Sequence, residues 1–429
     1  MRMALGLPDS YWPFITILFG LEAQDVPQSK KLFKELEVNW SGGVKEGYQL
    51  PFSMVFARLE GSSSTDWSCG RSVDPETALT KARSEAIEWD ASSRFEGRLI
   101  TAPFKELERA LNPQSIVSYH PRQYLQTDFP FAAFDPQRLV SWTEGIEVSS
   151  GQPIYIPADC TFFPYDPHYQ PYTSCNSSGT AAHPNREQAI ENAVLELIER
   201  DAFMLHWLLG TGVPRVSYGS LPDSAIKRIH DLEKLGFKVS ARNLTLDFLP
   251  VILVFAQNTQ RSFTTCAAAC DYDAGLALDH ALQEVESAIF TRMDSVGTTT
   301  IKPRDVRFTD DHGYLYEQSR YFKRADFLVN TPKVKSLGII NRQNNVRNWH
   351  QLLSQIERKG LKLYVVDLSS KDASLHVARA LIPGLIPMSF GFGIEPKGMT
   401  RIYSDSVSLG LRTSVPKYGE LQSFPHPYT

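Results

Sequence analysis

The sequence predicts a mixed α/β (α+β) fold built from repeated helix–sheet units. With 429 residues, of which 42% are hydrophobic, the chain can bury a large core. Helical and strand-like segments interleave without the regular rhythm of a parallel sheet. One helical motif also recurs along the chain, which indicates an internal structural repeat.

Capping residues and hydrophobic periodicity predict the main elements. One helix begins at Asp74-Pro75-Glu76, with Asp as the cap and Pro in the first position, and extends to about Phe95. Residues 151–172 are rich in proline and predict an extended or looped passage, whereas 302–348 show no clear pattern. The other predicted helices are 185–208, 223–235, 275–293 and 346–358, and the predicted strands are 52–59, 237–243, 250–255 and 362–368.

Charge and apolar runs exclude several classes of protein. The 44 basic and 48 acidic residues give a net charge of −4, which is unusual for a nucleic-acid-binding protein. No apolar run reaches the roughly 18 residues of a membrane span, so we expect no membrane partner. The cysteines are odd in number and dispersed, which favours a reducing cytoplasm, and we expect Cys266 and Cys270 to be buried as small apolar residues.

The recurring motif is Ala-x3-Ala-x2-Glu-x2-Glu. It is intact at 78–88 and at 189–199, and it recurs at 277–287 with Ser287 in place of the second glutamate. At about 100° per residue, both glutamates lie on or beside the face that carries the alanines. Because alanine lets helices approach closely, we expect this face to point inward.

Inward-facing carboxylates require neutralisation, since burial of an unpaired charge is costly. Hard divalent cations with oxygen ligands are one solution, and Mg2+ that carries nucleotide phosphates is the usual case. Arg200 could hold a phosphate oxygen. The alternative is a solvated acidic helix surface. The predicted metal ligands are Glu85, Glu88, Glu196 and Glu199, whereas the repeated Asp90 and Asp201 are expected to be structural.

Known nucleotide and nucleophile motifs are missing from the sequence. It contains no GxxxxGK[ST] loop, no G-x-S-x-G elbow and no kinase signature. If the chain handles ATP, we expect it to do so with acidic helices and metal in place of a glycine-rich phosphate loop.

Three stretches resemble the YcaO family, and specifically the D-protein branch of thiazole/oxazole-modified peptide cyclodehydratases. They are GRSVDPETALTKARSEAIE at 70–88, NSSGTAAHPNREQAIENAVLELIERDA at 176–202, and a C-terminal region with PGLIPMSFGFG, TRIY and the tail FPHPYT. The composition of that tail alone is typical of a disordered end. The resemblance implies a YcaO-type fold with an ATP site between acidic helices, covering 61–429, with 1–60 packed on it.

The resemblance also implies an ATP- and Mg2+-dependent enzyme that converts Cys, Ser or Thr of a ribosomal precursor peptide to azolines. The four acids would bind metal, and the tail would line the active site through Pro425, Pro427 and Thr429. Implied nucleotide ligands are Arg200, Gln188, Glu284 and Arg292.

The resemblance further implies protein partners. Because no fused leader-binding module is evident, we expect a separate ThiF-like or winged-helix partner, and a flavin-dependent azoline dehydrogenase is a further candidate. Trp89, Pro184 and Gln188 depart from the usual family residues. A thioamide- or amidine-forming enzyme, a non-catalytic scaffold and a carboxylate–metal hydrolase therefore stay open as alternatives.

Overall fold

The computed structural model describes residues 33–38, 44–45, 47–59, 67–95, 97–369 and 375–428. Thr429 and the predicted polar loop at 61–64 lie outside this range. The mixed α/β class is confirmed, and three antiparallel or largely antiparallel sheets each carry one long helix. Within the described residues, no helix is long and apolar enough to cross a lipid bilayer.

The first unit is a small sheet covered by a helix. Its strand order is β1-β4-β5, and the register is antiparallel throughout. Because β4 precedes and β5 follows residue 60, the described part of the N-terminal segment pairs directly with the main domain. The bounds are β1 Phe33–Val38, β4 Ser53–Leu59, β5 Ser68–Ser72 and α1 Pro75–Ser92, with a separate β2 (Val44–Lys45) and β3 (Tyr48–Gln49) pair.

The second unit is a six-stranded sheet on which the longest helix packs. The order is β6-β7-β15-β16-β9, and β8 pairs with β7. Helix α4 lies against β16 and β9. The bounds are β6 Leu99–Pro103, β7 Leu139–Glu147, β8 Gln152–Pro157, β9 Thr180–His183, α4 Arg186–Leu209, β15 Tyr364–Asp367 and β16 His376–Leu381.

The third unit is a five-stranded sheet with the order β13-β12-β11-β10-β14. Helix α6 covers β12 and β13, and α5 packs on β11. The bounds are β10 Arg215–Val216, α5 Asp223–Lys234, β11 Lys238–Asn243, β12 Val251–Asn258, β13 Phe263–Cys270, α6 Ala274–Arg292 and β14 Val334–Lys335. The remaining helices are α2 Pro113–Ile116, α3 Pro121–Tyr124, α7 Thr309–Leu315, α8 Asp326–Val329, α9 Leu337–Gln343, α10 Trp349–Arg358 and α11 Thr400–Ser408.

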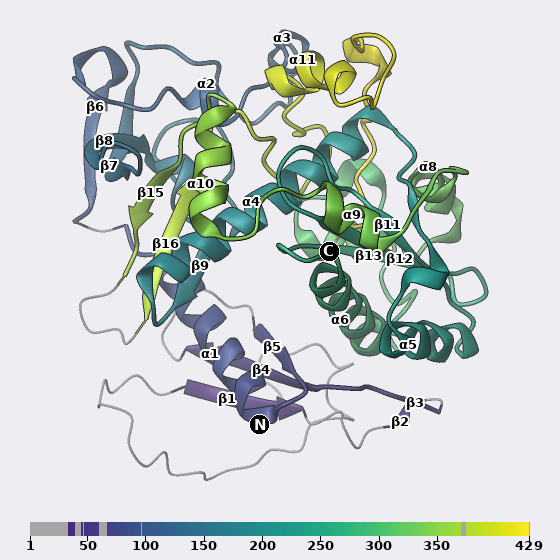
Figure 1. Ribbon diagram of the computed structural model, residues 1–429. Coiled ribbons are helices and arrows are strands. Elements are labelled where there is room, and N and C mark those ends of the chain that lie inside the picture. The colour runs from purple at the N-terminus through teal and green to yellow at the C-terminus, as the bar shows by residue number, and fades with distance from the viewer. Residues whose placement is uncertain are drawn as a thin grey trace.

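The sequence repeat is a structural repeat. In each unit a strand leads directly into the motif helix: β5 into α1, β9 into α4 and β13 into α6. The motif alanines of all three helices are buried, as their inward-facing pattern predicts. Helix α4 crosses the centre of the molecule, with α1 and its sheet at one end and α6 beside it (Figure 1).

The repeat requires a very close approach between β5 and α1. A Cβ atom built on Gly70 would lie 1.8 Å from the carbonyl oxygen of Ala78 and 2.5 Å from the amide nitrogen of Ala82. Both atoms are backbone, so the neighbours cannot rotate away. The alanine face of α1 therefore matches a glycine on the strand beneath it.

We predict that Gly70→Ala lowers the free energy of unfolding by about 1–3 kcal/mol, the usual cost of overpacking a core. Denaturant unfolding of the purified chain measures the change. Gly219→Ala is the matched control, because no atom lies within 4 Å of a Cβ built there. Equal stability of the two variants would show that β5 and α1 can separate freely.

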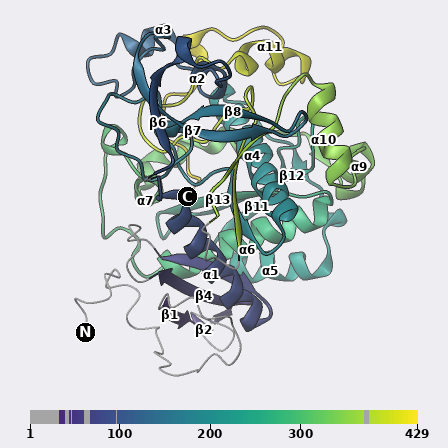
Figure 2. The same cartoon turned by 90° about the vertical axis from the view of Figure 1, so that its left-hand side faces the viewer.

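Several expectations need correction. Strands β6, β7, β13 and β16 are not predicted as strands, because β13 reads as small residues and the others lie in stretches with mixed patterns. Helix α10 begins at Trp349, where Asn348 provides the cap, and not at Val346. The tail is not a disordered end: Pro425 to Tyr428 are buried, and the chain end returns to the interior (Figures 1 and 2).

Candidate active site between the acidic helices

The first glutamate of each intact motif reaches back to the strand that precedes its helix. Cys69 N–H donates to Glu85 at 2.7 Å, and Gly179 N–H donates to Glu196 at 2.9 Å. These two contacts occupy equivalent places in the repeat. A backbone donor therefore fixes one oxygen of each carboxylate and leaves the other oxygen available.

The second glutamate of each motif lies deeper in the fold. Glu199 is only 9% exposed, and its carboxylate accepts a hydrogen bond of 2.5 Å from the Tyr428 hydroxyl. Glu88 is partly buried and accepts a hydrogen bond from the backbone of Ala182, on β9. Helices α1 and α4 thus meet at β9 with their acids facing each other.

The pKa values of these acids are raised because of burial and mutual repulsion. Burial, with further contributions from Glu284 and Glu196, raises the pKa of Glu85 to about 7. Burial and the neighbouring Glu196 and Glu85 raise the pKa of Glu88 well above its ordinary value. Burial also raises the pKa of Glu199 to about 8, although the Arg200 guanidinium opposes that shift. The site holds more negative charge than its own cations neutralise.

A cavity of about 360 Å³ opens between the three motif helices. All three units contribute to its wall, so the repeat creates a shared site. The lining residues are Cys69, Arg71, Lys81, Asn192, Leu195, Glu196, Glu199, Ala269, Cys270, Asp271, His280, Gln283 and Glu284. A larger open hollow of about 670 Å³ runs along α5, but it contains none of the motif acids.

The basic residues of the site have unused hydrogen-bonding capacity. Arg200 Nη2 lies 3.1 Å from Glu196 Oε1, and Arg71 Nη1 lies 3.8 Å from Glu284 Oε1. Buried Nε and Nη1 of Arg200 and Nε of Arg71 make no hydrogen bond. Buried donors are normally satisfied. The arrangement therefore fits a phosphate, which presents acceptors to guanidinium groups.

The acids also fit Mg2+, although they do not form a complete protein cage. In the described parts of the chain, no three Asp, Glu, His or Cys side chains converge closely enough to coordinate one ion. Mg2+ typically takes one or two carboxylates and completes its shell with waters and substrate phosphates. Paired carboxylates beside unsatisfied guanidinium donors match that mode of binding.

The other predicted site residues lie in different surroundings. Gln188 is exposed in the first turn of α4, and Glu284 lines the cavity. Arg292 does not line the cavity; it forms a 2.8 Å ion pair with Glu317. Pro425 and Pro427 are buried in the tail. The site roles of these residues stay predictions, as does that of Thr429.

Sequence reasoning did not assign Arg71, Lys81, Asn192 or Gln283 to the site. Arg71 directly follows Gly70, and such a pairing of a close-approach glycine with a cation is the signal that could have identified it. Asn192 lies on the same face of α4 as Glu196 and Glu199, three to four residues apart. Lys81 and Gln283 carry no comparable signal.

The repeated Asp201 has the structural role expected of it. It is buried, pairs with Arg401 at 2.8 Å and accepts the Ile386 N–H at 2.8 Å. Residues 69–386, more than half of the chain, match the family described as "YcaO cyclodehydratase, ATP- and Mg2+-binding". The chain belongs to the YcaO family. The match begins at β5 and includes all four motif acids.

Known proteins that resemble this YcaO protein share its fold at low sequence identity. A curated but uncharacterised protein of Methanothermobacter thermautotrophicus is 22% identical over 79% of this chain and 85% of its own length. The solved structure titled "Heterocyclase in complex with substrate and Cofactor" has a TM-score of 0.73 and 19% identity, and covers 87% of this chain. This chain spans only 52% of that heterocyclase.

Two further structures have fewer residues beyond the shared fold. YcaO from Methanopyrus kandleri, bound with AMPPCP and Mg2+, has a TM-score of 0.62 and 16% identity, covering 83% of this chain and 86% of that one. The Escherichia coli microcin synthetase McbBCD complex with pro-MccB17 bound contains a chain with a TM-score of 0.58 and 13% identity. The match covers 80% of this chain and 89% of that one.

Proposed function

We propose that this YcaO protein is the ATP- and Mg2+-dependent cyclodehydratase subunit of a peptide-modifying complex. Its substrate would be a ribosomal precursor peptide, whose Cys, Ser or Thr residues become azolines. The observation that carries the proposal is the meeting of Glu85 and Glu88 with Glu196 and Glu199 around one cavity, next to unsatisfied donors of Arg200. Family membership and the AMPPCP- and Mg2+-bound neighbour support it.

The chemistry explains why a nucleotide is needed. A Cys, Ser or Thr side chain attacks the preceding backbone carbonyl, but the former carbonyl oxygen is a poor leaving group. ATP supplies a phosphoryl group that makes this oxygen leave as phosphate. The protein must therefore hold phosphates, neutralise their charge and exclude water.

The residues of the site suit these tasks. The Glu85 and Glu196 carboxylates, each fixed on one side by a backbone N–H, would hold metal ions together with Glu88 and Glu199. Arg200 is oriented by Glu196 and would direct its unsatisfied Nη1 to a phosphate oxygen. Arg71 would act similarly from β5, and Glu284 of α6 keeps it in place.

Substrate selection would depend on a second protein. The neighbouring microcin synthetase is a multiprotein complex solved with its precursor bound. We propose that a separate ThiF-like or winged-helix partner binds the leader peptide of the substrate and presents its core to this site.

Intact-mass measurement of a precursor peptide tests the function and separates the alternatives. With ATP, Mg2+ and the partner, cyclodehydration removes one water per ring, whereas a thioamide-forming enzyme replaces oxygen by sulfur and adds mass. A hydrolase needs no nucleotide, and a scaffold causes no mass change of its own. Loss of water that persists without ATP, or an unchanged precursor under all conditions, would contradict the proposal.

Metal binding should depend on pH. The pKa values of Glu85 and Glu199, about 7 and about 8, lie above their ordinary 4.5, so the folded chain keeps protons that the unfolded chain releases. This contribution to metal-free stability is complete below pH 4.5 and is lost as pH rises through 7 to 8. Since metal needs deprotonated carboxylates, its affinity should rise about tenfold per pH unit for each proton displaced.

We therefore expect Mg2+ with AMPPCP to raise the unfolding temperature more at a pH above this range than below it. Thermal unfolding at both pH values, with and without Mg2+ and AMPPCP, measures the difference. A thermal shift of the same size on both sides of the range would mean that these carboxyls do not bind the metal.

A further inference from the structure

We propose that Tyr428, the penultimate residue, is a positioning residue that holds Glu199 and Arg200 in their metal- and phosphate-binding orientations. The inference rests on the proposed function and deepens it, because it makes the chain end a working part of the nucleotide site. It stands on geometry at both faces of the Tyr428 side chain.

The tail is held along its length by specific side chains. The consecutive carbonyl oxygens of Phe424, Pro425 and His426 accept hydrogen bonds from Trp207 Nε1 (3.1 Å), Tyr316 Oη (2.9 Å) and His312 Nδ1 (2.8 Å). His312 can donate there because its Nε2 accepts from Gly391 N–H at 3.0 Å, which fixes the neutral tautomer. This precise anchoring leads the chain to Tyr428.

The Tyr428 hydroxyl bridges β13 and the acidic site. It accepts from Ala268 N–H at 3.2 Å and lies 2.5 Å from Glu199 Oε1 and 3.2 Å from the Ala268 carbonyl oxygen. A hydroxyl has a single proton to donate. The shorter distance and the carboxylate charge favour donation to Glu199, since hydrogen bonds to ionised acceptors are shorter and stronger.

The ring of Tyr428 holds the neighbouring cation. The Arg200 guanidinium carbon lies 4.6 Å from the ring centroid, within the range of a cation–π contact. The same guanidinium donates from Nη2 to Glu196 Oε1. With one side on the ring and one edge on Glu196, Arg200 keeps its buried Nε and Nη1 without hydrogen-bond partners and directed at a ligand.

The position of Tyr428 is costly for a chain end and has a local purpose. Terminal residues are usually poorly ordered unless they are tied down. Tyr428 is 1% exposed, bridges to Cys266 of the edge strand β13, and packs its ring on Phe203 of α4 at 4.8 Å. One residue thereby connects the strand of the third unit to the acids of the second.

The test compares two tyrosine hydroxyls that each bind a glutamate of α4. Tyr428→Phe removes the bond to Glu199, whereas Tyr272→Phe removes a 2.6 Å bond to Glu191, about two turns away and outside the cavity lining. Calorimetric titration with Mg2+ and AMPPCP is the readout. We expect Tyr428→Phe to weaken binding on the order of tenfold and Tyr272→Phe to leave it unchanged.

A double-mutant cycle keeps the inference separate from simple destabilisation. In a Glu199→Gln background, Tyr428→Phe should weaken binding much less than it does in the wild type, because its effect passes through Glu199. Equal weakening in both backgrounds, or wild-type binding by Tyr428→Phe, would overturn the positioning role. Failure of the wild-type chain to bind Mg2+ and AMPPCP at all would instead overturn the proposed function, and this inference with it.

Discussion

Glu199→Gln is expected to abolish ATP-dependent modification of the precursor while the fold is kept. The substitution removes a carboxylate from the site in which metal and phosphate charge would be balanced. Removal of one preorganised electrostatic group typically lowers the rate about 10²–10³-fold. Intact-mass kinetics of the precursor measure the loss.

The same variant should not be less stable than the wild type. The Glu199 carboxylate is buried at 9% exposure and its pKa is raised to about 8, so the folded chain tolerates its charge poorly. Glutamine keeps an oxygen that can accept the Tyr428 hydroxyl. Lost activity with an equal or higher unfolding temperature is typical of an acid that is kept for function at the expense of stability.

Glu187→Gln provides the matched control, since it removes the same charge from an exposed position in the first turn of α4. We expect this variant to modify the precursor at close to the wild-type rate. Wild-type activity in Glu199→Gln would remove that residue from the site, and equal losses in both variants would show a general charge effect on α4.

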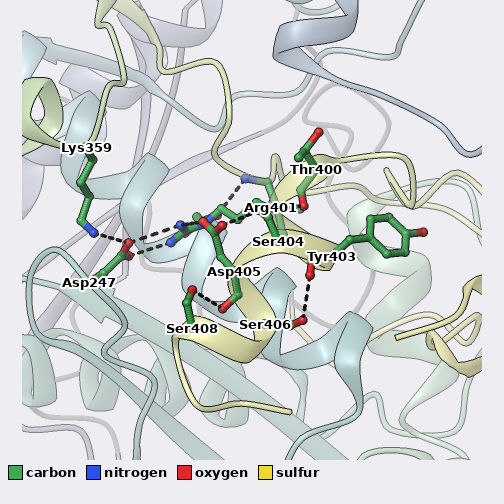
Figure 3. Close-up of polar contacts among 11 residues, drawn as sticks. Asp247, Lys359, Thr400, Arg401, Tyr403, Ser404, Asp405, Ser406 and Ser408 are labelled. Atoms are coloured by element: carbon green, nitrogen blue, oxygen red, sulfur yellow. Dashed lines mark hydrogen bonds and ion pairs between the residues drawn. The ribbon is translucent and has the colours of Figure 1, made fainter. Parts of the chain in front are cut away.

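Arg401→Met should be strongly destabilising for a different reason. Arg401 is buried in α11 and joins three carboxylates: Nη2 lies 2.8 Å from Asp201 and 2.7 Å from Asp247, and Nη1 lies 2.8 Å from Asp405. Figure 3 shows Arg401 pointing toward Asp247, which Lys359 contacts from the other side. The network fastens α11 and α4 together.

Removal of the guanidinium leaves the Asp201 carboxylate, 1% exposed, without a compensating charge. Loss of one partner from a buried ion pair typically costs about 3–5 kcal/mol. Denaturant unfolding measures this cost. Lys227→Met is the control, because the exposed Lys227–Asp231 pair of α5 should contribute less than about 1 kcal/mol. A cost below 1 kcal/mol for Arg401→Met would show that the network adds little to stability.

The helices and the acidic motif were predictable because their signals are local. Asp74 and Pro75 mark the start of α1, and the Ala/Glu spacing sets which face of α1 and α4 is buried. These features depend on residues within a few turns. The same spacing identified the four acids before any packing was known.

Other parts of the site depend on contacts that are distant in sequence. Tyr428 meets Glu199 across 229 positions, and no periodicity connects them. Arg71 reaches the cavity because β5 places it there, and β13 is a strand because pairing with β12 overrides its alanine-rich composition. Tail proline and histidine look like a disordered end, but Tyr316 and His312 hold their carbonyls in the interior.

The most direct test of the account is a crystal structure of this YcaO protein grown with Mn2+ and AMPPCP and measured for anomalous scattering. Mn2+ scatters anomalously and uses the same oxygen ligands as Mg2+. The account predicts metal peaks bound by carboxylates from both α1 and α4, with a phosphate oxygen beside Arg200. Nucleotide bound elsewhere, or metal that contacts none of Glu85, Glu88, Glu196 and Glu199, would contradict it.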